Sequence, residues 1–216
     1  MIAVIDYGVG NLFSVAKAVE AVGASVEITG DAQKIRAADK VILPGVGAFG
    51  DCMKNLRERG LDEVIKEQIG LGKPLLGICV GLQILFDGSE ESPDARGLGI
   101  FRGTVKKIRA DGLKIPHMGW NKTIRNEELG IRNEKTGLLI PHSAFLIPNC
   151  ISNCFFYFVH SYHAVPEDRS IIAATTEYGE CLTAAIAHDN ILAVQFHPEK
   201  SGDVGLKLLQ NFIGQE

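Results

Sequence analysis

A cysteine, a histidine and a glutamate occur in patterns that could bring them together as a nucleophile and its base. Cys79 lies in the segment Gly77-Ile-Cys-Val-Gly81, at the end of a continuous apolar run. His197 and Glu199 follow a second apolar run, at 191–196. A thiol is activated when an imidazole takes its proton, and a carboxylate fixes the tautomer of that imidazole. These residue types predict covalent catalysis by a cysteine.

The glycines around Cys79 predict a sharp turn from a strand into a helix. The run Leu75–Cys79 is typical of a strand buried on both faces, and apolar residues at 82, 85 and 86 have helical spacing. The pattern is that of the Gly-x-Ser-x-Gly elbow, which presents a nucleophile at the top of a sheet. Amides from Val80 onward would then stabilise a thiolate and later an oxyanion. The alternative is a buried structural cysteine, which is the commoner role of a free cysteine.

The spacing of His197 and Glu199 is suited to a shared site. In an extended segment, residues two apart point to the same side, and Pro198 restricts the backbone between them. A surface turn with an incidental histidine and glutamate is the alternative. The presence of an elbow cysteine elsewhere in the chain favours the catalytic interpretation.

Composition indicates an ordinary soluble globular protein rather than a nucleic-acid or membrane protein. The 216 residues are 46% hydrophobic and 22% charged, with a net charge of −4, so we expect no basic surface for nucleic acid and no membrane partner. No apolar run approaches the roughly 20 residues of a membrane span, and the N-terminus predicts a strand rather than a signal peptide. Five irregularly spaced cysteines are typical of reduced thiols, so we expect a cytoplasmic protein.

Strand-like runs alternate with helical patterns along most of the chain. The alternation predicts a single α/β domain over 1–216, doubly wound around a mostly parallel sheet, with the site at the carboxyl ends of its strands. A region richer in β-branched residues from Gly103 predicts antiparallel strands appended to that sheet. We expect strands at 2–5, 26–28, 41–43, 75–79, 171–176, 183–187 and 191–196. We expect one helix to begin at residue 12, a short one to begin at Asp31, two more to cover 51–59 and 61–71, and a final one to begin near Asp203.

Two glycine-rich turns invite a nucleotide-binding interpretation that the context opposes. Gly8-Val-Gly10 follows the first strand, but Phe13 occupies the third glycine position of the dinucleotide fingerprint. The segment Gly45-Val-Gly-Ala-Phe-Gly50 matches the fingerprint literally, yet it follows a later strand and no acidic residue for a ribose follows it. A glycine loop beside a cysteine elbow is better suited to donating a backbone N–H to an oxyanion.

Several motifs along the chain together carry a family resemblance. They are Asp6-Tyr-Gly-Val-Gly-Asn11, Leu43-Pro-Gly-Val-Gly47, Gly77-Ile-Cys-Val-Gly-Leu-Gln83, Pro116-His-Met-Gly-Trp-Asn121, Tyr157-Phe-Val-His-Ser-Tyr162 and Gln195-Phe-His-Pro-Glu199. Together they resemble the class I glutamine amidotransferases and, more narrowly, the glutaminase subunits of imidazole glycerol phosphate synthases. The resemblance implies a flavodoxin-like fold, a Cys79–His197–Glu199 triad and L-glutamine as substrate, with no cofactor and no metal.

The same resemblance implies roles for further residues. The loop Gly45, Val46 and Gly47 would form the oxyanion hole together with Val80, and Gly47 is the expected donor. Contacts to the bound glutamine are implied for Gln83, Glu91, Ser161 and Tyr162, while Asn11, Trp120 and Lys200 are expected to face a partner subunit.

The partner implied by the resemblance is a cyclase subunit with a (β/α)₈ barrel, bound as a heterodimer. It would use the ammonia to make imidazole glycerol phosphate and aminoimidazole carboxamide ribotide in histidine biosynthesis. Two alternatives stay open: a glutaminase serving another synthase, such as the pyridoxal phosphate synthase, and a non-catalytic docking module of the same fold.

The segment 122–154 departs from the resemblance. It contains two near-copies, Ile124-Arg-Asn-Glu-Glu-Leu-Gly130 and Ile131-Arg-Asn-Glu-Lys-Thr-Gly137, which are too short for a coiled coil and predict a polar surface insertion. A zinc site built from Cys150, Cys154, His160 and His163 is disfavoured, because the spacing does not suit a finger and a three-residue offset in a strand points the histidines to opposite faces.

Overall fold

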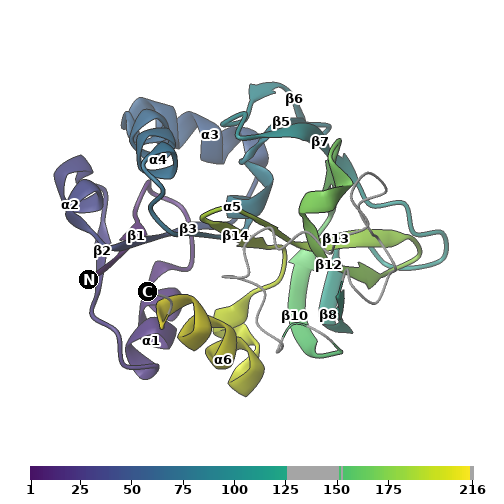
Figure 1. The fold of residues 1–216 in the computed structure, drawn as a ribbon. Helices are drawn as coiled ribbons and strands as arrows, with labels where there is room; N and C mark the ends of the chain where they lie inside the picture. The colour runs from purple at the N-terminus through teal and green to yellow at the C-terminus, as the bar shows by residue number, and fades with distance from the viewer. Residues whose placement is uncertain (126–150, 152, 215–216) are drawn as a thin grey trace, which may run out of the picture.

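The computed structural model describes residues 1–125, 151 and 153–214, and an eight-stranded sheet runs through it (Figure 1). Five neighbouring strands are parallel, and the last three, β13, β12 and β9, extend the sheet in antiparallel fashion. The prediction of a mostly parallel sheet with an antiparallel extension is therefore confirmed. The order is β2 (Val26–Thr29), β1 (Ile2–Ile5), β3 (Lys40–Gly45), β4 (Leu75–Cys79), β14 (Ile191–Val194), β13 (Cys181–His188), β12 (Ile172–Glu177) and β9 (Ile124–Arg125).

Helices cover both faces of the parallel strands, as a doubly wound fold requires. Figure 1 shows α1 (Leu12–Ala21) and α6 (Gly202–Ile213) on one face and α3 (Phe49–Glu58) and α4 (Leu61–Gly70) on the other, with α2 (Ala32–Ala37) near the β2 edge. The four longer helices each bury a stripe of mostly apolar residues, whereas α2 buries Ile35 alone. In α6 the stripe is Gly205, Leu208, Leu209 and Phe212.

Two smaller sheets stand beside the main one. A four-stranded sheet has the order β11 (Tyr162–Pro166), β7 (Phe101–Lys107), β5 (Phe86–Ser89) and β6 (Ser92–Arg96). A two-stranded ribbon pairs β8 (His117–Lys122) with β10 (Phe155–His160). The strand expected from Gly103 was predicted to join the main sheet, but β7 lies in the four-stranded sheet instead, because its partners are β5 and β11.

The helix after Cys79 is shorter than its apolar spacing predicted. It is a single turn, α5 (Val80–Gln83), and Phe86 already belongs to β5. Every residue from 80 to 86 is buried, so apolar residues face all directions here and their spacing carries no information about a helix. Residues 88–93 contain several turn-forming types, yet they include the ends of the paired strands β5 and β6.

The ends of the predicted insertion 122–154 belong to the fold. Thr123 and Ile151 are fully buried, and the Thr123 hydroxyl donates to the carbonyl of Ile151. Strand β9 pairs with β12 at the edge of the main sheet. The interior of the segment, 126–150 and 152, includes Cys150 and lies outside the described residues, so the surface insertion stays a prediction for that part.

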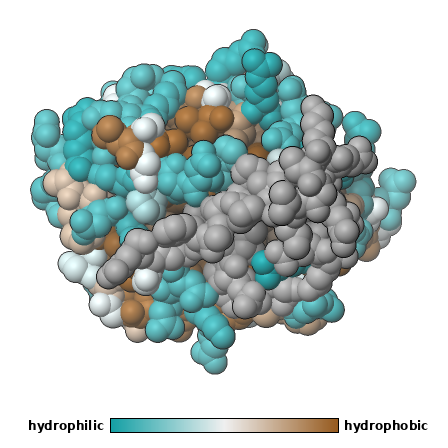
Figure 2. Space-filling view, viewed as in Figure 1, coloured by the Kyte–Doolittle hydropathy of each residue, from teal (hydrophilic) through white to brown (hydrophobic). Residues whose placement is uncertain are grey.

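On the face seen in Figure 2, hydrophilic residues make up much of the described surface, with apolar patches between them. Within the described ranges, no helix has both the length and the apolar character needed to cross a membrane.

Candidate active site

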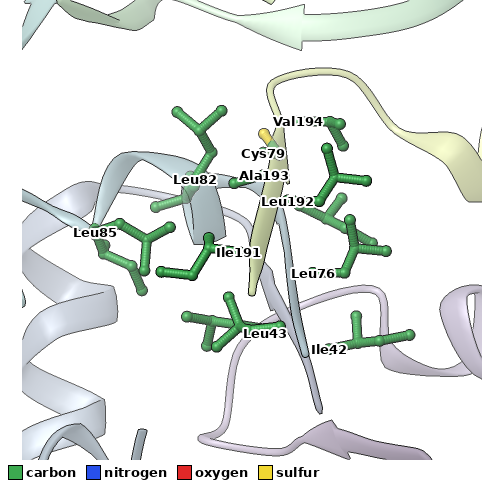
Figure 3. Packing of buried hydrophobic residues seen from close by; sticks show 14 of the residues in the cluster. Ile42, Leu43, Leu76, Cys79, Leu82, Leu85, Ile191, Leu192, Ala193 and Val194 are labelled. Atoms are coloured by element: carbon green, nitrogen blue, oxygen red, sulfur yellow. The ribbon is translucent and has the colours of Figure 1, made fainter. Parts of the chain in front are cut away.

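Cys79 lies on the strained turn that its flanking glycines predicted. It ends β4 with φ 55° and ψ −111°, a backbone conformation that residues with a side chain rarely adopt. The glycines are needed for space: a Cβ on Gly81 would lie 1.9 Å from the carbonyl oxygen of Leu43, and one on Gly77 would lie 2.9 Å from the Cβ of Ala193. Figure 3 shows the sulfur of Cys79 above the apolar core, beside Leu82 and Val194.

His197 and Glu199 form a buried pair shortly after β14, where Pro198–Lys200 is a 3₁₀ turn and not the extended segment that the sequence predicted. Nδ1 of His197 lies 2.8 Å from Oε1 of Glu199, and the two side chains are 3% and 1% exposed. The hydroxyl of Ser201 donates to the carbonyl of His197 at 2.6 Å, and the His197 amide donates to the carbonyl of Tyr157 at 2.9 Å. These bonds fix both the backbone and the ring of the histidine.

The surroundings of His197 favour its charged form. Burial alone would lower the pKa of the imidazole, but the Cys79 thiol and the Glu199 carboxylate outweigh burial and raise this pKa to about 9. Nε2 has no partner at hydrogen-bond distance among the described residues, so its contact with Cys79 is looser than an ordinary hydrogen bond. At neutral pH the ring is therefore an imidazolium whose free N–H can be given to a leaving group.

Replacing Glu199 with glutamine should lower the pKa of His197 and slow catalysis. The neutral amide no longer stabilises the imidazolium, so we expect its pKa to fall below the value of about 9 in the parent protein. Turnover should fall about 10²- to 10⁴-fold, as when a triad carboxylate is lost. NMR titration of the labelled imidazole measures the first effect, and a glutamate-release assay the second.

A matched control is Glu63→Gln, which removes an exposed carboxylate of α4. It should change neither the pKa of His197 nor the rate. An unchanged His197 titration in Glu199→Gln would contradict the pairing.

Cys79 and His197 line a cavity of about 320 Å³, near the lower end of the usual range for small-molecule sites (about 300–1,000 Å³). The cavity brings together ten of the predicted site residues from the two ends and the middle of the chain. These are Val46, Gly47, Cys79, Val80, Gln83, Glu91, Ser161, Tyr162, His197 and Lys200. Pro116, Val159 and His160 also line it and were not predicted as site residues.

Four predicted site residues lie outside the cavity lining. Glu199 stands behind His197, and Gly45 is buried against the elbow, where a Cβ would lie 2.7 Å from the Gly81 amide. Asn11 precedes α1, and its side chain makes no capping hydrogen bond there. Trp120 is 56% exposed on the outer side of the β8–β10 ribbon.

A buried glutamine beneath the cysteine was missed by the sequence analysis. Gln195 is fully buried, and its Nε2 lies 3.8 Å from the Cys79 sulfur. Its Oε1 accepts from Nε2 of Gln83 at 3.1 Å, and Gln83 also donates to the carbonyl of Tyr162 at 2.9 Å. The available signal was a polar residue inside the apolar run 191–196, because a buried amide requires polar partners.

Glu91 lines the cavity and also organises the loop above it. One carboxylate oxygen accepts from the amide of Phe49 at 2.8 Å, at the start of α3. A carboxylate is favourable at a helix N-terminus. Glu91 therefore connects the β5–β6 hairpin to the helix that follows the glycine loop.

The glycine loop is held from below by two buried groups. The Tyr7 hydroxyl donates to the carbonyl of Pro44 at 2.7 Å, and the Cys52 thiol donates to the carbonyl of Val46 at 3.4 Å. Because the carbonyl and the N–H of a trans peptide point in opposite directions, the amide of Gly47 points away from Cys52. Gly47 has φ +87°, which favours glycine at this position.

In this site a cysteine on a tight turn and a His–Glu pair lie at one small cavity. A family match over nearly the whole sequence agrees with that geometry. The model of the class I glutamine amidotransferases matches residues 3–215. This chain belongs to the class I glutamine amidotransferase family. The amidotransferase is also similar to curated relatives over nearly its full length.

Three of these relatives carry the name imidazole glycerol phosphate synthase subunit HisH. The amidotransferase is 46% identical to the protein of Acinetobacter baylyi, with 98% of this chain and 97% of the relative covered. It is 49% identical to that of Aquifex aeolicus (97% and 94% covered) and 50% identical to that of Thermosynechococcus vestitus (98% and 95%).

Solved structures share the fold at lower sequence identity. A structure described as a glutamine amidotransferase superposes with a TM-score of 0.72 at 16% identity, covering 99% of this chain and 100% of that one. The structure of PurLQS from Thermotoga maritima also gives 0.72, at 20% identity, with 98% and 96% covered. The class I amidotransferase fold is confirmed by these likenesses.

Proposed function

We propose that this amidotransferase is the glutaminase subunit of an imidazole glycerol phosphate synthase. In this role it hydrolyses L-glutamine to glutamate and ammonia for histidine biosynthesis. The observation that carries the proposal is the meeting of Cys79, His197 and Glu199 below one cavity, in a chain that is 46–50% identical to HisH subunits.

The proposed reaction begins with the sulfur of Cys79 attacking the side-chain amide carbon of glutamine. The carbonyl oxygen becomes an oxyanion, and the His197 imidazolium gives its proton to the leaving nitrogen, so ammonia departs and a thioester forms. The neutral imidazole then takes a proton from water, and the hydroxide attacks the thioester. Collapse of this second intermediate releases glutamate and restores the thiolate–imidazolium pair.

Backbone amides are the proposed stabilisers of both oxyanions. Val80 begins α5 directly after the nucleophile, and Gly47 lies across the same cavity. One such donor typically contributes about 2.7–4 kcal/mol of transition-state stabilisation. Gly45 is packed against the elbow, whereas no heavy atom lies within 4 Å of the position of a Cβ on Gly47, so we propose the Gly47 amide as the donor from this loop.

The walls of the cavity offer complementary groups for an amino acid. A carboxylate at Glu91 suits the substrate ammonium, while backbone N–H groups at Ser161 and Tyr162 suit the substrate carboxylate. Gln83 holds the carbonyl of Tyr162 from behind. We propose these four residues as the glutamine-binding set.

The ammonia must pass to a second protein, and we propose a cyclase subunit with a (β/α)₈ barrel as the partner in a heterodimer. It would convert phosphoribulosyl formimino aminoimidazole carboxamide ribotide to imidazole glycerol phosphate and aminoimidazole carboxamide ribotide. Support for a docking surface comes from the outer side of the β8–β10 ribbon, where Met118, Trp120 and Phe155 are 60%, 56% and 55% exposed. Exposed apolar side chains on neighbouring strands are typical of an interface. Asn11 and Lys200 are the polar residues we assign to the same contact.

Removing the indole of Trp120 should weaken this docking. Aromatic residues dominate binding at interfaces, so Trp120→Ala is expected to raise the dissociation constant for the cyclase at least about tenfold. Titration calorimetry with the purified cyclase measures it.

Leu71→Ala provides the matched control. Like Trp120, Leu71 is a large apolar residue that is exposed (73%), but it directly follows α4 and lies outside the β8–β10 ribbon. It should leave the affinity unchanged. Equal affinities for Trp120→Ala and the parent protein would remove Trp120 from the proposed interface.

Co-purification separates the proposal from its alternatives. A chain that retains the barrel cyclase and releases glutamate from glutamine supports it. Retention of a pyridoxal phosphate synthase instead would favour the other synthase, and binding without glutamate release would favour a docking module. We also propose that the enzyme acts in the cytoplasm; the support is that the four described cysteines are free thiols, as is usual in a reducing compartment.

A further inference from the structure

A line of three polar side chains, two of them buried, runs from the cavity wall at His160 to the partly buried Asn121 and has no role in the proposed chemistry. His117 and His160 are 2% and 6% exposed, and Nδ1 of His117 lies 2.9 Å from Nε2 of His160. Nδ1 of His160 lies 2.9 Å from the carbonyl oxygen of Tyr162. At the other end, Nδ2 of Asn121 lies 3.2 Å from Nε2 of His117. We call this set the histidine relay.

The chemistry of the acceptors fixes the direction of every hydrogen bond in the relay. A carbonyl can only accept, so Nδ1 of His160 carries the proton. A neutral imidazole has one N–H, so Nε2 of His160 accepts from Nδ1 of His117, and Nε2 of His117 accepts from the Asn121 amide. Burial keeps both rings neutral, because it lowers the pKa of His117 to about 4 and that of His160 to about 3. The relay therefore has one set of tautomers across the physiological pH range.

Packing holds the rings of the relay in place. The ring of His117 is stacked between Phe158 and Tyr178, with centroid distances of 4.8 Å and 4.1 Å. Asn121 is anchored by a second bond, from its Nδ2 to the carbonyl of Glu177 at 2.9 Å. When the residues of a hydrogen-bonded chain are restrained in this way, displacing one of them breaks its hydrogen bond to the next. The position of the residue at one end of the chain therefore depends on the residue at the other end.

The two ends of the relay lie at different functional surfaces. One end is the Tyr162 carbonyl, in the Ser161–Tyr162 segment that lines the cavity. The other is β8, where successive side chains alternate between faces. Asn121 and His117 point inward, whereas Trp120 belongs to the exposed face of the ribbon. Figure 1 shows β8 and β10, which carries His160, side by side.

We propose that His117 and His160 are positioning residues that hold the Ser161–Tyr162 backbone ready for the glutamine carboxylate and tie it to the strand that carries Trp120. The inference rests on the proposed function, because it assigns the carboxylate site to that segment. It predicts that the relay affects binding of glutamine-like molecules more than the reactivity of the cysteine itself.

The test compares two reagents that alkylate Cys79. Iodoacetamide has no amino-acid group and reports the reactivity of the sulfur alone, while the diazoketone analogue of glutamine also requires its carboxylate to be bound. His160→Phe removes one of the two donors to the Tyr162 carbonyl and leaves the other, Nε2 of Gln83, in place. We expect the half-saturating concentration of the analogue to rise about tenfold, the effect of one lost hydrogen bond, with the iodoacetamide rate unchanged. In the complex with the cyclase, KM for glutamine should rise by a similar factor and kcat should change less.

Two further variants complete the design. His160→Asn can place an amide N–H where Nδ1 stood and should restore most of the analogue affinity. His163→Phe is the matched control: it also removes a buried imidazole, 6% exposed, but His163 lies outside the relay and its Nδ1 has no hydrogen-bond partner among the described residues. It should leave both reagents unaffected.

The outcomes separate the relay from the proposed function. Parallel changes in both alkylation rates, or no change with the analogue, would overturn the relay. If His160→Phe fails to fold, His117→Phe decides, since it keeps an aromatic ring between Phe158 and Tyr178; we expect the same selective loss, about threefold, and its absence would overturn the relay. A parent protein that neither reacts with the analogue nor releases glutamate would instead refute the proposed function.

Discussion

Cys79→Ala should abolish glutamate release, lowering turnover by at least about 10⁴-fold, the scale of losing a triad nucleophile. No other thiol can replace it within the described residues, because Cys79 is the one described cysteine that lines the cavity. The fold should persist, since alanine is smaller than cysteine and removes only the sulfur. A glutamine hydrolysis assay with the cyclase present measures the loss, and circular dichroism checks the fold.

The control for this variant is Cys181→Ala, which removes an exposed thiol of β13. Its turnover should equal that of the parent protein. If glutamate is still released by Cys79→Ala at a rate near that of the control, the sulfur is not the nucleophile and the mechanism given above is wrong.

Gly81→Ala should destabilise the protein and disable the elbow together. The added Cβ would meet the Leu43 carbonyl oxygen at 1.9 Å, which is far below contact distance and involves backbone on both sides. Either β3 or the start of α5 must move, so we expect a loss of roughly 3 kcal/mol or more in the free energy of unfolding. Because the same shift displaces Cys79, turnover should fall as well. Urea unfolding and the hydrolysis assay report the two effects.

Gly70→Ala is the matched control, because it adds the same methyl group at a position where there is room for it. Gly70 ends α4, and no heavy atom lies within 4 Å of the position a Cβ would take. Gly70→Ala should therefore leave activity unchanged and stabilise the protein by up to about 1 kcal/mol. Equal stabilities of the two variants would show that the elbow is not as tightly packed as the contacts indicate.

The local parts of the site followed from the sequence because they depend on neighbouring residues. A Gly-x-Cys-x-Gly segment after an apolar run requires a tight turn, whatever the rest of the chain does. His197 and Glu199 were paired on the expectation of an extended segment, in which residues two apart point to the same side. The pair is present, but a 3₁₀ turn over Pro198–Lys200 brings the two side chains together, so the expected backbone conformation was wrong. The runs that became β1, β3, β4 and β14 were recognisable for the same reason: strands buried on both faces are continuously apolar.

The elements that the sequence predicted poorly lie where burial surrounds the chain on all sides. The helix after Cys79 was expected to continue through Phe86, but it ends at Gln83 because tertiary packing, rather than an exposed face, selects the conformation there. Strand β7 was assigned to the wrong sheet for a related reason. Strand pairing depends on partners far along the chain, and β-propensity does not identify them.

The amino-acid sequence by itself indicated the proposed nucleophile, its proposed base and the turn that presents the sulfur, since each depends on a few adjacent residues. Only the tertiary structure decided which distant polar groups support them. Gln83 and Gln195 are 112 positions apart, and His117 and His160 are 43 apart, yet each pair is hydrogen-bonded and buried. Such contacts follow from strand order and sheet packing, which bring remote segments together, and a buried polar group must find its partner among whatever residues those segments supply.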